Sequence, residues 1–228
     1  KPLLFDGGMG TYYKAAPGAD CEMANLTDPE GVKKVHAEYL AAGAQAIKTN
    51  TFGLPRMAAA QMPGWEELAE AGWKLACDAA AEKDAAVFAD LGPAPDTEAA
   101  PASSAYGLVA QQFAALGAKN FLFETLSSDV GIVEAVKALR VAVPDAFVMV
   151  SFAVLPDGYT REGLLFRDLL RRMEQSGVVD AVGLNCVSAP GAMKKLVQSL
   201  GETLLPLSVM PNAGYPVVTR ARVLYQGK

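Results

Sequence analysis

The feature that most constrains the fold of this chain is a repeated alternation of short apolar segments with longer amphipathic ones. Each apolar segment ends in a polar or glycine-containing turn and is followed by residues with helical periodicity. Strands that alternate with helices form parallel sheets, because a parallel connection has to cross over the sheet and a helix makes that crossing. The sequence therefore predicts an α/β fold with a parallel sheet.

Seven strands are predicted in this alternation: Pro2–Phe5, Ala44–Lys48, Ala86–Ala89, Asn120–Phe123, Ala146–Val150, the segment that ends at Asn185-Cys186, and Leu205–Met210. The predicted helices are Asp28–Leu40, Trp65–Lys83, Ser103–Leu116, Ser128–Val141, Gly163–Gln175 and Pro190–Leu200. The first of these helices has the clearest start, because Asp28 can cap it and Pro29 suits its first turn.

The number of strand–helix units favours a (β/α)8 barrel. Seven units in 228 residues, with an eighth added, match the roughly 250 residues of such barrels. We therefore predict a TIM barrel that residues 1–228 form as a single domain, incomplete at its C-terminal end because the eighth βα unit is missing or disordered. An open doubly wound sheet is the alternative, since the sequence does not show the strand order.

Composition excludes several classes of protein. The net charge is −5 and no basic stripe with interleaved aromatic residues occurs, so no nucleic-acid partner is expected. No apolar run reaches the roughly 18 residues that span a bilayer, so no membrane partner is expected either. The three cysteines, Cys21, Cys77 and Cys186, are an odd number with wide spacing, which is not the pattern of a disulfide framework. We expect a cytoplasmic protein with reduced thiols.

Polar residues collect at the carboxyl end of every predicted strand. They are Asp6, Thr49, Asn50, Thr51, Asp90, Glu124, Thr125, Ser151, Asn185, Cys186 and Asn212. Any one of them has a purely structural explanation as a turn cap, a surface ion pair or, for Cys186, a small buried residue. In a parallel barrel, however, these ends surround one mouth, where the active site lies. The set as a whole therefore predicts a functional site.

The strand-end residues include no histidine, which restricts the chemistry they can carry out. The only histidine, His36, lies in the middle of a predicted helix and is expected to be structural. Serine–histidine and cysteine–histidine catalysis are therefore excluded. The carboxylates Asp6 and Glu124 beside the thiol of Cys186 suit the binding of a small amino acid, such as one that carries sulfur.

Five motifs, in the same order and register, resemble the homocysteine S-methyltransferase family. They are Phe5-Asp6-Gly7-Gly8-Met9-Gly10-Thr11, Lys48-Thr49-Asn50-Thr51-Phe52-Gly53, Phe123-Glu124-Thr125, Gly183-Leu184-Asn185-Cys186 and Pro211-Asn212-Ala213-Gly214-Tyr215-Pro216. The family consists of zinc-dependent barrels, and the spacing is most similar to the homocysteine-binding domain of cobalamin-dependent methionine synthase. The resemblance implies methionine biosynthesis, with a methyl group transferred to the thiolate of homocysteine.

The resemblance also implies roles for individual residues. Glu124 is expected to receive the amino group of homocysteine, and Asp6 is expected to be a second catalytic carboxylate near the substrate. The further residues expected to bind substrate are Thr49, Asn50, Thr51, Phe52, Ser151, Asn185 and Asn212.

Cys186 matches the first of three cysteines that hold zinc in this family. Zinc lowers the pKa of a bound thiol, and three protein sulfurs leave its fourth position open for the substrate. The other two cysteines are expected beyond Lys228, because neither Cys21 nor Cys77 takes their place. We therefore expect zinc in the complete protein, none in residues 1–228, and no activity from these residues alone.

The expected partners are homocysteine and either a methyl donor or a corrinoid protein, with cobalamin supplied by that partner or by another domain. Two alternatives stay open. In the first, the chain is a metal-free barrel that serves as a binding module of a corrinoid methyl-transfer system. In the second, it is a methyltransferase for another thiol or selenol acceptor.

Overall fold

A computed structural model describes residues 2–13, 20–213, 215–218 and 223–226, the last two segments by their backbone alone. Six strands form one sheet in which the strand order follows the chain: β1 (Ala46–Lys48), β2 (Ala86–Leu91), β3 (Asn120–Leu126), β4 (Phe147–Phe152), β5 (Ala181–Asn185) and β6 (Leu207–Met210). The pairs β1–β2, β4–β5 and β5–β6 are parallel. The predicted α/β fold with a parallel sheet is confirmed, whereas a closed barrel with an eighth βα unit stays a prediction.

Helices follow the strands, as the alternation predicts. They are α1 (Met9–Tyr12), the 3-10 helix η1 (Cys21–Met23), α2 (Ala24–Thr27), α3 (Pro29–Ala41), α4 (Leu54–Ala59), α5 (Trp65–Ala81), α6 (Ala102–Ala115), α7 (Ile132–Ala142), α8 (Phe166–Ser176) and α9 (Pro190–Leu200). Within the described part of the chain, no helix is both long enough and apolar enough to cross a membrane.

Two parts of the chain differ from the prediction made for their strands. The predicted strand Pro2–Phe5 forms only a single parallel bridge, between Phe5 and Ala46. Backbone hydrogen bonds join the segment to the start of β1, from Gln45 N to Leu4 O at 2.8 Å and from Asp6 N to Ala46 O at 2.9 Å, but Leu3 and Leu4 are exposed. After β6, the strands β7 (Tyr215–Val218) and β8 (Val223–Gln226) form an antiparallel hairpin that was not predicted.

The residues divide into two compact units, which are described separately. The first unit contains residues 1–122 and 130–147, and the second contains residues 123–129 and 148–228.

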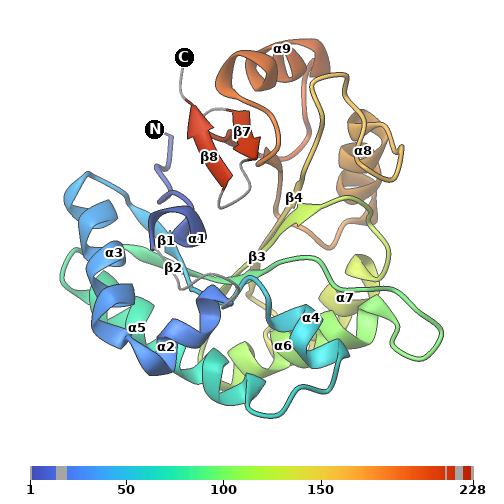
Figure 1. Cartoon of the computed structure of the whole chain (residues 1–228). Helices are drawn as coiled ribbons and strands as arrows, with labels where there is room; N and C mark the ends of the chain where they lie inside the picture. The colour runs from blue at the N-terminus through green and yellow to red at the C-terminus, as the bar shows by residue number, and fades with distance from the viewer. Residues whose placement is uncertain (1, 14–19, 214, 219–222, 227–228) are drawn as a thin grey trace. The chain divides into compact units, whose positions relative to one another are not determined.

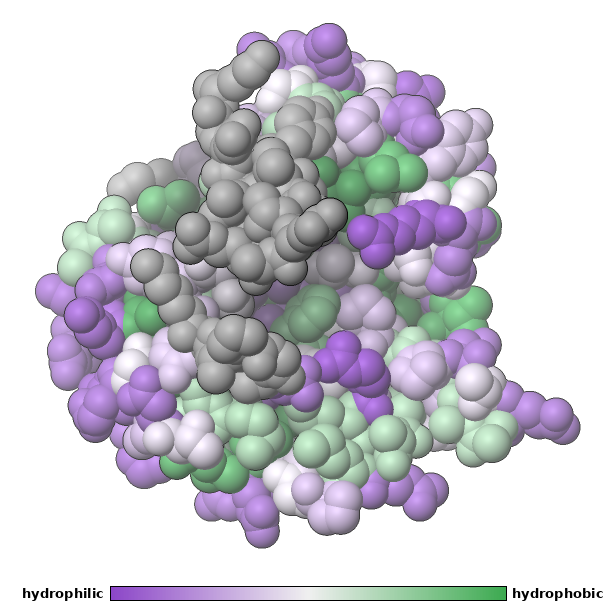
Figure 2. All heavy atoms as spheres, in the orientation of Figure 1, coloured by the Kyte–Doolittle hydropathy of each residue, from purple (hydrophilic) through white to green (hydrophobic). Residues whose placement is uncertain are grey.

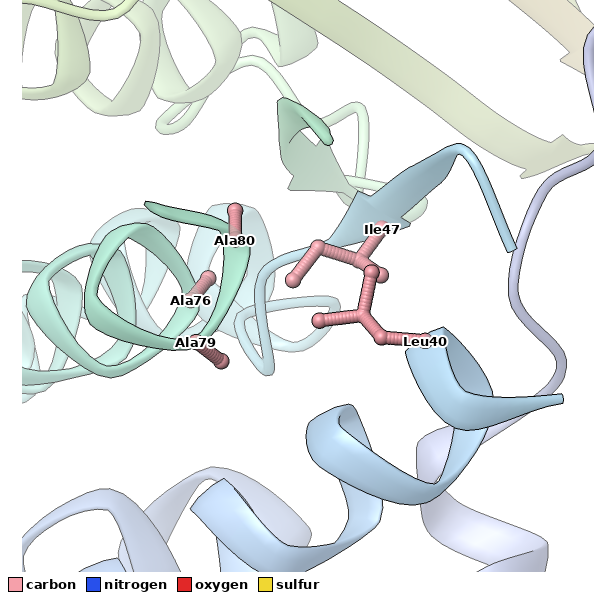
Figure 3. Packing of buried hydrophobic residues seen from close by; sticks show 5 residues of the cluster. All are labelled: Leu40, Ile47, Ala76, Ala79 and Ala80. Carbon is pink, nitrogen blue, oxygen red and sulfur yellow. The ribbon is translucent and has the colours of Figure 1, made fainter. Parts of the chain in front are cut away.

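The first unit is built around α3, α5 and β1, which pack side by side (Figure 1). Figure 3 shows the contact: Leu40 of α3 and Ile47 of β1 face the small side chains Ala76, Ala79 and Ala80 of α5. Alanine on the buried face lets the helix approach the strand closely.

The outer sides of α3 and α5 carry hydrophilic side chains (Figure 2). These include the exposed i,i+4 ion pairs Lys34–Glu38 and Lys74–Asp78. Helix α3 begins as predicted, because the Asp28 carboxylate accepts a hydrogen bond from the backbone N–H of Gly31. Helices α3 and α5 are therefore amphipathic, which is the pattern from which they were predicted.

His36 lies in α3 with no exposed surface. Burial lowers the pKa of its imidazole from 6.5 to about 4. Neither ring nitrogen has a hydrogen-bond partner among the described residues. The folded protein therefore holds this side chain neutral.

Acid is expected to destabilise the protein through His36. Below pH 6.5 the unfolded chain binds a proton on this residue, but the folded form does not until the pH approaches 4. This contribution to stability is therefore complete above pH 6.5 and falls by about 3 kcal/mol between pH 6.5 and 4. Urea unfolding at a series of pH values measures the loss, and His36→Leu should flatten it. If the pH dependence of stability is unchanged in His36→Leu, His36 is not the residue responsible for it.

The second unit contains β4, β5 and β6 with helices α8 and α9. Every residue of β5 is buried. Leu169, Leu170 and Met173 form the buried face of α8. In the register of β4 and β5, Ser151 lies opposite Gly183. Asn185, two residues further along β5, therefore points to the same side of the sheet as Gly183.

Candidate functional site

The second unit brings together four of the predicted site residues: Glu124 of β3, Ser151 of β4, Asn185 at the end of β5, and Cys186 directly after it. Strands β3 and β4 continue past their predicted ends at Phe123 and Val150, so Glu124 and Ser151 belong to strands rather than to the turns. Glu124, Ser151 and Asn185 are buried, whereas Cys186 is partly exposed.

The carboxamide of Asn185 connects this cluster. Its Oδ1 accepts hydrogen bonds from the backbone N–H of Thr125 at 2.9 Å and from Ser151 Oγ at 3.0 Å. Its Nδ2 donates to Thr125 Oγ1 at 2.8 Å. Longer contacts of 3.4 Å join Nδ2 to Glu124 Oε2 and to Cys186 Sγ. A carboxylate and a thiol from separate strands are therefore held by one side chain.

Three residues in or directly beside this cluster have backbone conformations that residues with side chains rarely adopt. Thr125, Cys186 and Val187 have φ angles of 60°, 56° and 54°. Left-handed conformations cost a non-glycine residue roughly 1–3 kcal/mol, and they concentrate at functional sites. Two of the three side chains are β-branched, for which the conformation is least favourable. Interactions with the surrounding structure therefore have to offset the energetic cost of these three left-handed conformations.

Hydrogen bonds account for part of that energy. The backbone N–H of Cys186 donates to Met210 O at 3.0 Å, and that of Asn212 donates to Ser188 O at 3.1 Å. The Ser188 hydroxyl, fully buried, donates to Val154 O at 2.7 Å. The first two bonds attach the turn after β5 to the end of β6, which places the predicted residue Asn212 beside it, and the third attaches the turn to the segment after β4. Gly214, from the same predicted motif, lies outside the described residues.

The thiol of Cys186 has polar neighbours within its own unit. Its sulfur lies 3.6 Å from Thr125 Oγ1, which donates to it, and 3.4 Å from Asn185 Nδ2. Hydroxyl and amide groups of this kind orient a sulfur but are not zinc ligands.

The other two cysteines lie in the first unit, Cys21 in η1 and Cys77 in α5. Burial raises the pKa of Cys21 to about 11, and it also raises the pKa of Cys77. Among the described residues, no group of three histidine, cysteine, aspartate or glutamate side chains is placed to hold a metal ion. The residues present therefore do not fit a zinc site with three protein ligands.

In the first unit, the predicted residues Thr49 and Thr51 are engaged with the backbone of β2. The Asp90 N–H donates to Thr49 Oγ1 at 3.0 Å, and Thr51 Oγ1 donates to Asp90 O at 2.9 Å. The two hydroxyl oxygens lie 2.6 Å apart and share a hydrogen bond. Both threonines are buried, so these hydroxyls fasten the loop after β1 to the end of β2.

Asn50, also predicted, is held by residues that the sequence did not single out. Its Nδ2 donates to Asn25 Oδ1 and to Cys21 O, both at 2.9 Å, and its backbone carbonyl accepts from Asn25 Nδ2 at 2.8 Å. The buried carboxylate of Glu22 accepts a hydrogen bond from Gly53 N at 2.5 Å. No periodicity or motif marks Glu22 or Asn25, because they lie in short helices of three and four residues.

Asp6 and Phe52 complete the predicted set in this unit. Asp6 Oδ2 accepts from the backbone N–H of Lys48 at 3.0 Å, so it is tied to the end of β1. Phe52 lines a pocket of about 300 Å³. The pocket is formed by Phe52, Gly53, Arg56, Pro93, Ala94 and Pro95.

A parallel α/β sheet with carboxylate, amide and thiol groups at the carboxyl ends of its strands defines the class of the protein: an α/β protein with a strand-end site. A family model described as homocysteine S-methyltransferase matches residues 3–226. The chain belongs to the homocysteine S-methyltransferase family.

Individual relatives agree with this assignment. The chain is 31% identical over 245 residues to methionine synthase of Mycobacterium tuberculosis, an alignment that covers 95% of this chain and 20% of that protein. It is 25% identical to homocysteine S-methyltransferase of Escherichia coli, covering 93% of this chain and 78% of that protein. The chain thus spans about one fifth of the mycobacterial methionine synthases that it matches.

Among solved structures, the metallated form of the homocysteine methyltransferase MmuM from Escherichia coli superimposes with a TM-score of 0.75 at 23% identity. The match covers 94% of this chain and 85% of that one. The apo form of the same protein gives 0.69 at 27% identity. The fold is therefore the one that these methyltransferases have.

Proposed function

We propose that this protein transfers a methyl group to the sulfur of homocysteine and so forms methionine. The family match over residues 3–226 carries the proposal. The cluster in the second unit supports it, because a buried carboxylate and a thiol are joined there through Asn185. These groups suit a substrate that has an ammonium group at one end and a thiol at the other.

Glu124 is the proposed partner of the ammonium group of homocysteine. Its carboxylate is only 6% exposed, and a charge pair is stronger where water is excluded. Asn212 is proposed to border the same substrate from the second unit, and Ser151 is proposed to serve the site through its hydrogen bond to Asn185. For the first unit, we propose that Asp6 and the loop residues Thr49, Asn50, Thr51 and Phe52 contribute to substrate binding, with the threonine and asparagine side chains shaping the loop.

Zinc is proposed for the complete protein, with Cys186 as one of its ligands. Because the described residues do not fit a zinc site, the other two ligands are proposed to be cysteines beyond Lys228. The methyl donor is proposed to reach the site as a separate molecule or from a corrinoid partner that carries cobalamin.

Two measurements on the same samples test these proposals. The whole natural protein is expected to contain about one zinc ion and to form methionine from homocysteine with a methyl donor such as S-methylmethionine or methylcobalamin. Cys186→Ser should lose both properties because a ligand is removed. Residues 1–228 alone should bind no stoichiometric zinc and form no methionine. Homocysteine binding without methyl transfer in the zinc-loaded whole protein would instead favour a binding module, and unchanged zinc in Cys186→Ser would contradict the ligand assignment.

A further inference from the structure

The hydrogen-bond partners of the Asn185 carboxamide determine which side of the group carries the oxygen and which the nitrogen. The backbone N–H of Thr125 can only donate, so the Asn185 atom that faces it at 2.9 Å has to be the oxygen. Ser151 Oγ adds a second hydrogen bond to the same oxygen. The amide nitrogen therefore faces the opposite way, toward Glu124 and Cys186.

Thr125 holds the carboxamide at both ends. Its N–H binds Oδ1, and its hydroxyl oxygen accepts from Nδ2 at 2.8 Å. Thr125 makes this pair of bonds with a φ of 60°, a conformation that disfavours a β-branched side chain. The same hydroxyl donates to Cys186 Sγ, so Asn185 reaches the sulfur both directly and through Thr125. The need to hold Asn185 in place gives a physical reason for the strained conformation of Thr125.

Asn185 is 1% exposed, and both polar atoms of its side chain bond to groups of its own unit. A side chain in this position is poorly placed to contact a substrate. It is well placed to determine where a carboxylate and a sulfur lie relative to each other.

We propose that Asn185 is a positioning residue of the methyl-transfer site rather than a substrate ligand. It aligns the Glu124 carboxylate with the Cys186 sulfur, and Ser151 acts only through it. This inference rests on the proposed function, because it assigns Glu124 and Cys186 to one reaction.

The test is a double-mutant cycle in the whole natural protein, with kcat and KM for homocysteine measured on variants shown to be folded by circular dichroism. Asn185→Asp keeps the acceptor for Thr125 N and Ser151 but replaces the donor with a second oxygen. It is expected to lower kcat about a hundredfold, because the sulfur and carboxylate lose their common donor. Ser151→Ala should lower kcat about fivefold. The double variant should match Asn185→Asp within about twofold, because residues that act through one another are not additive.

Ser188→Ala is the matched control. Ser188 and Ser151 both have no exposed surface, and each hydroxyl makes one hydrogen bond within the unit, but Ser188 binds Val154 O and not Asn185. Its effect should therefore add to that of Asn185→Asp.

Other outcomes overturn the inference. Additive effects of Ser151→Ala and Asn185→Asp contradict the path through Asn185. An increase in KM with unchanged kcat in Asn185→Asp identifies a substrate ligand instead. In both cases the wild-type protein still forms methionine, so the proposed function stands. A wild-type protein that neither binds homocysteine nor transfers a methyl group to it overturns both proposals.

Discussion

Replacing Glu124 by Gln is expected to weaken homocysteine binding about a hundredfold to a thousandfold. The substitution keeps the shape of the side chain but removes the charge that is proposed to pair with the substrate ammonium group. Glu124 is buried, and removing one partner of a buried ion pair costs about 3–5 kcal/mol. Each factor of ten in affinity corresponds to about 1.4 kcal/mol. Calorimetric titration with homocysteine measures the change directly.

Glu162→Gln in the same unit is the matched control. Glu162 is exposed and its carboxylate accepts a hydrogen bond from Ser127 Oγ rather than from Asn185, so the same loss of charge occurs on a solvent-exposed side chain. Its homocysteine affinity should stay within about twofold of wild type. Equal losses in both variants would mean that overall charge, and not a pairing at Glu124, governs binding.

Gly183→Ala is expected to destabilise the protein by about 2–3 kcal/mol. A Cβ atom at this position would lie 2.8 Å from Ser208 Cβ, 2.9 Å from Ser208 O and 3.2 Å from Ser151 Oγ. The neighbouring strands β4 and β6 have to move apart to admit it, and overpacking of this kind typically costs 1–3 kcal/mol. Urea unfolding measures the loss. Because Ser151 binds Asn185, kcat for methionine formation by the whole natural protein should fall as well.

Gly191→Ala separates this steric effect from the general effect of replacing glycine. Gly191 lies in α9, and apart from the neighbouring backbone of its own helix no described atom comes within 4 Å of the position of its Cβ. Alanine is the better helix former by about 1 kcal/mol, so the control should be neutral or stabilising. A loss of stability at Gly191 similar to that at Gly183 would contradict the close approach as the cause.

The helices were the most predictable part of the fold. The predicted helix Pro190–Leu200 has the same bounds as α9, and the helix predicted from Asp28 begins one residue later, at Pro29. Both segments combine a clear start signal with buried side chains at helical spacing. The helix α4 was missed because its six residues are too few to show a period.

Strand ends were less predictable than strand cores. Ser151 was predicted to follow its strand but lies inside β4. Its hydroxyl bonds to Asn185, so a polar residue is accommodated within the buried sheet. Conversely, Pro2–Phe5 is apolar but forms one bridge to β1 rather than a full strand, and Leu3 and Leu4 stay exposed, so apolar composition alone did not determine the extent of this strand.

By itself, the sequence determined that the chain is a parallel α/β protein of the homocysteine S-methyltransferase family, and that Glu124, Ser151, Asn185 and Cys186 lie at or near strand ends. Periodicity and motif order are properties of neighbouring residues, so they can be read along the chain. Only the tertiary structure decided that Asn185 contacts the other three, that Thr125 binds it with a left-handed backbone, and that Thr49 and Thr51 bind the backbone of Asp90. Hydrogen bonds between residues forty or sixty positions apart depend on how strands pack together, and no local pattern encodes them.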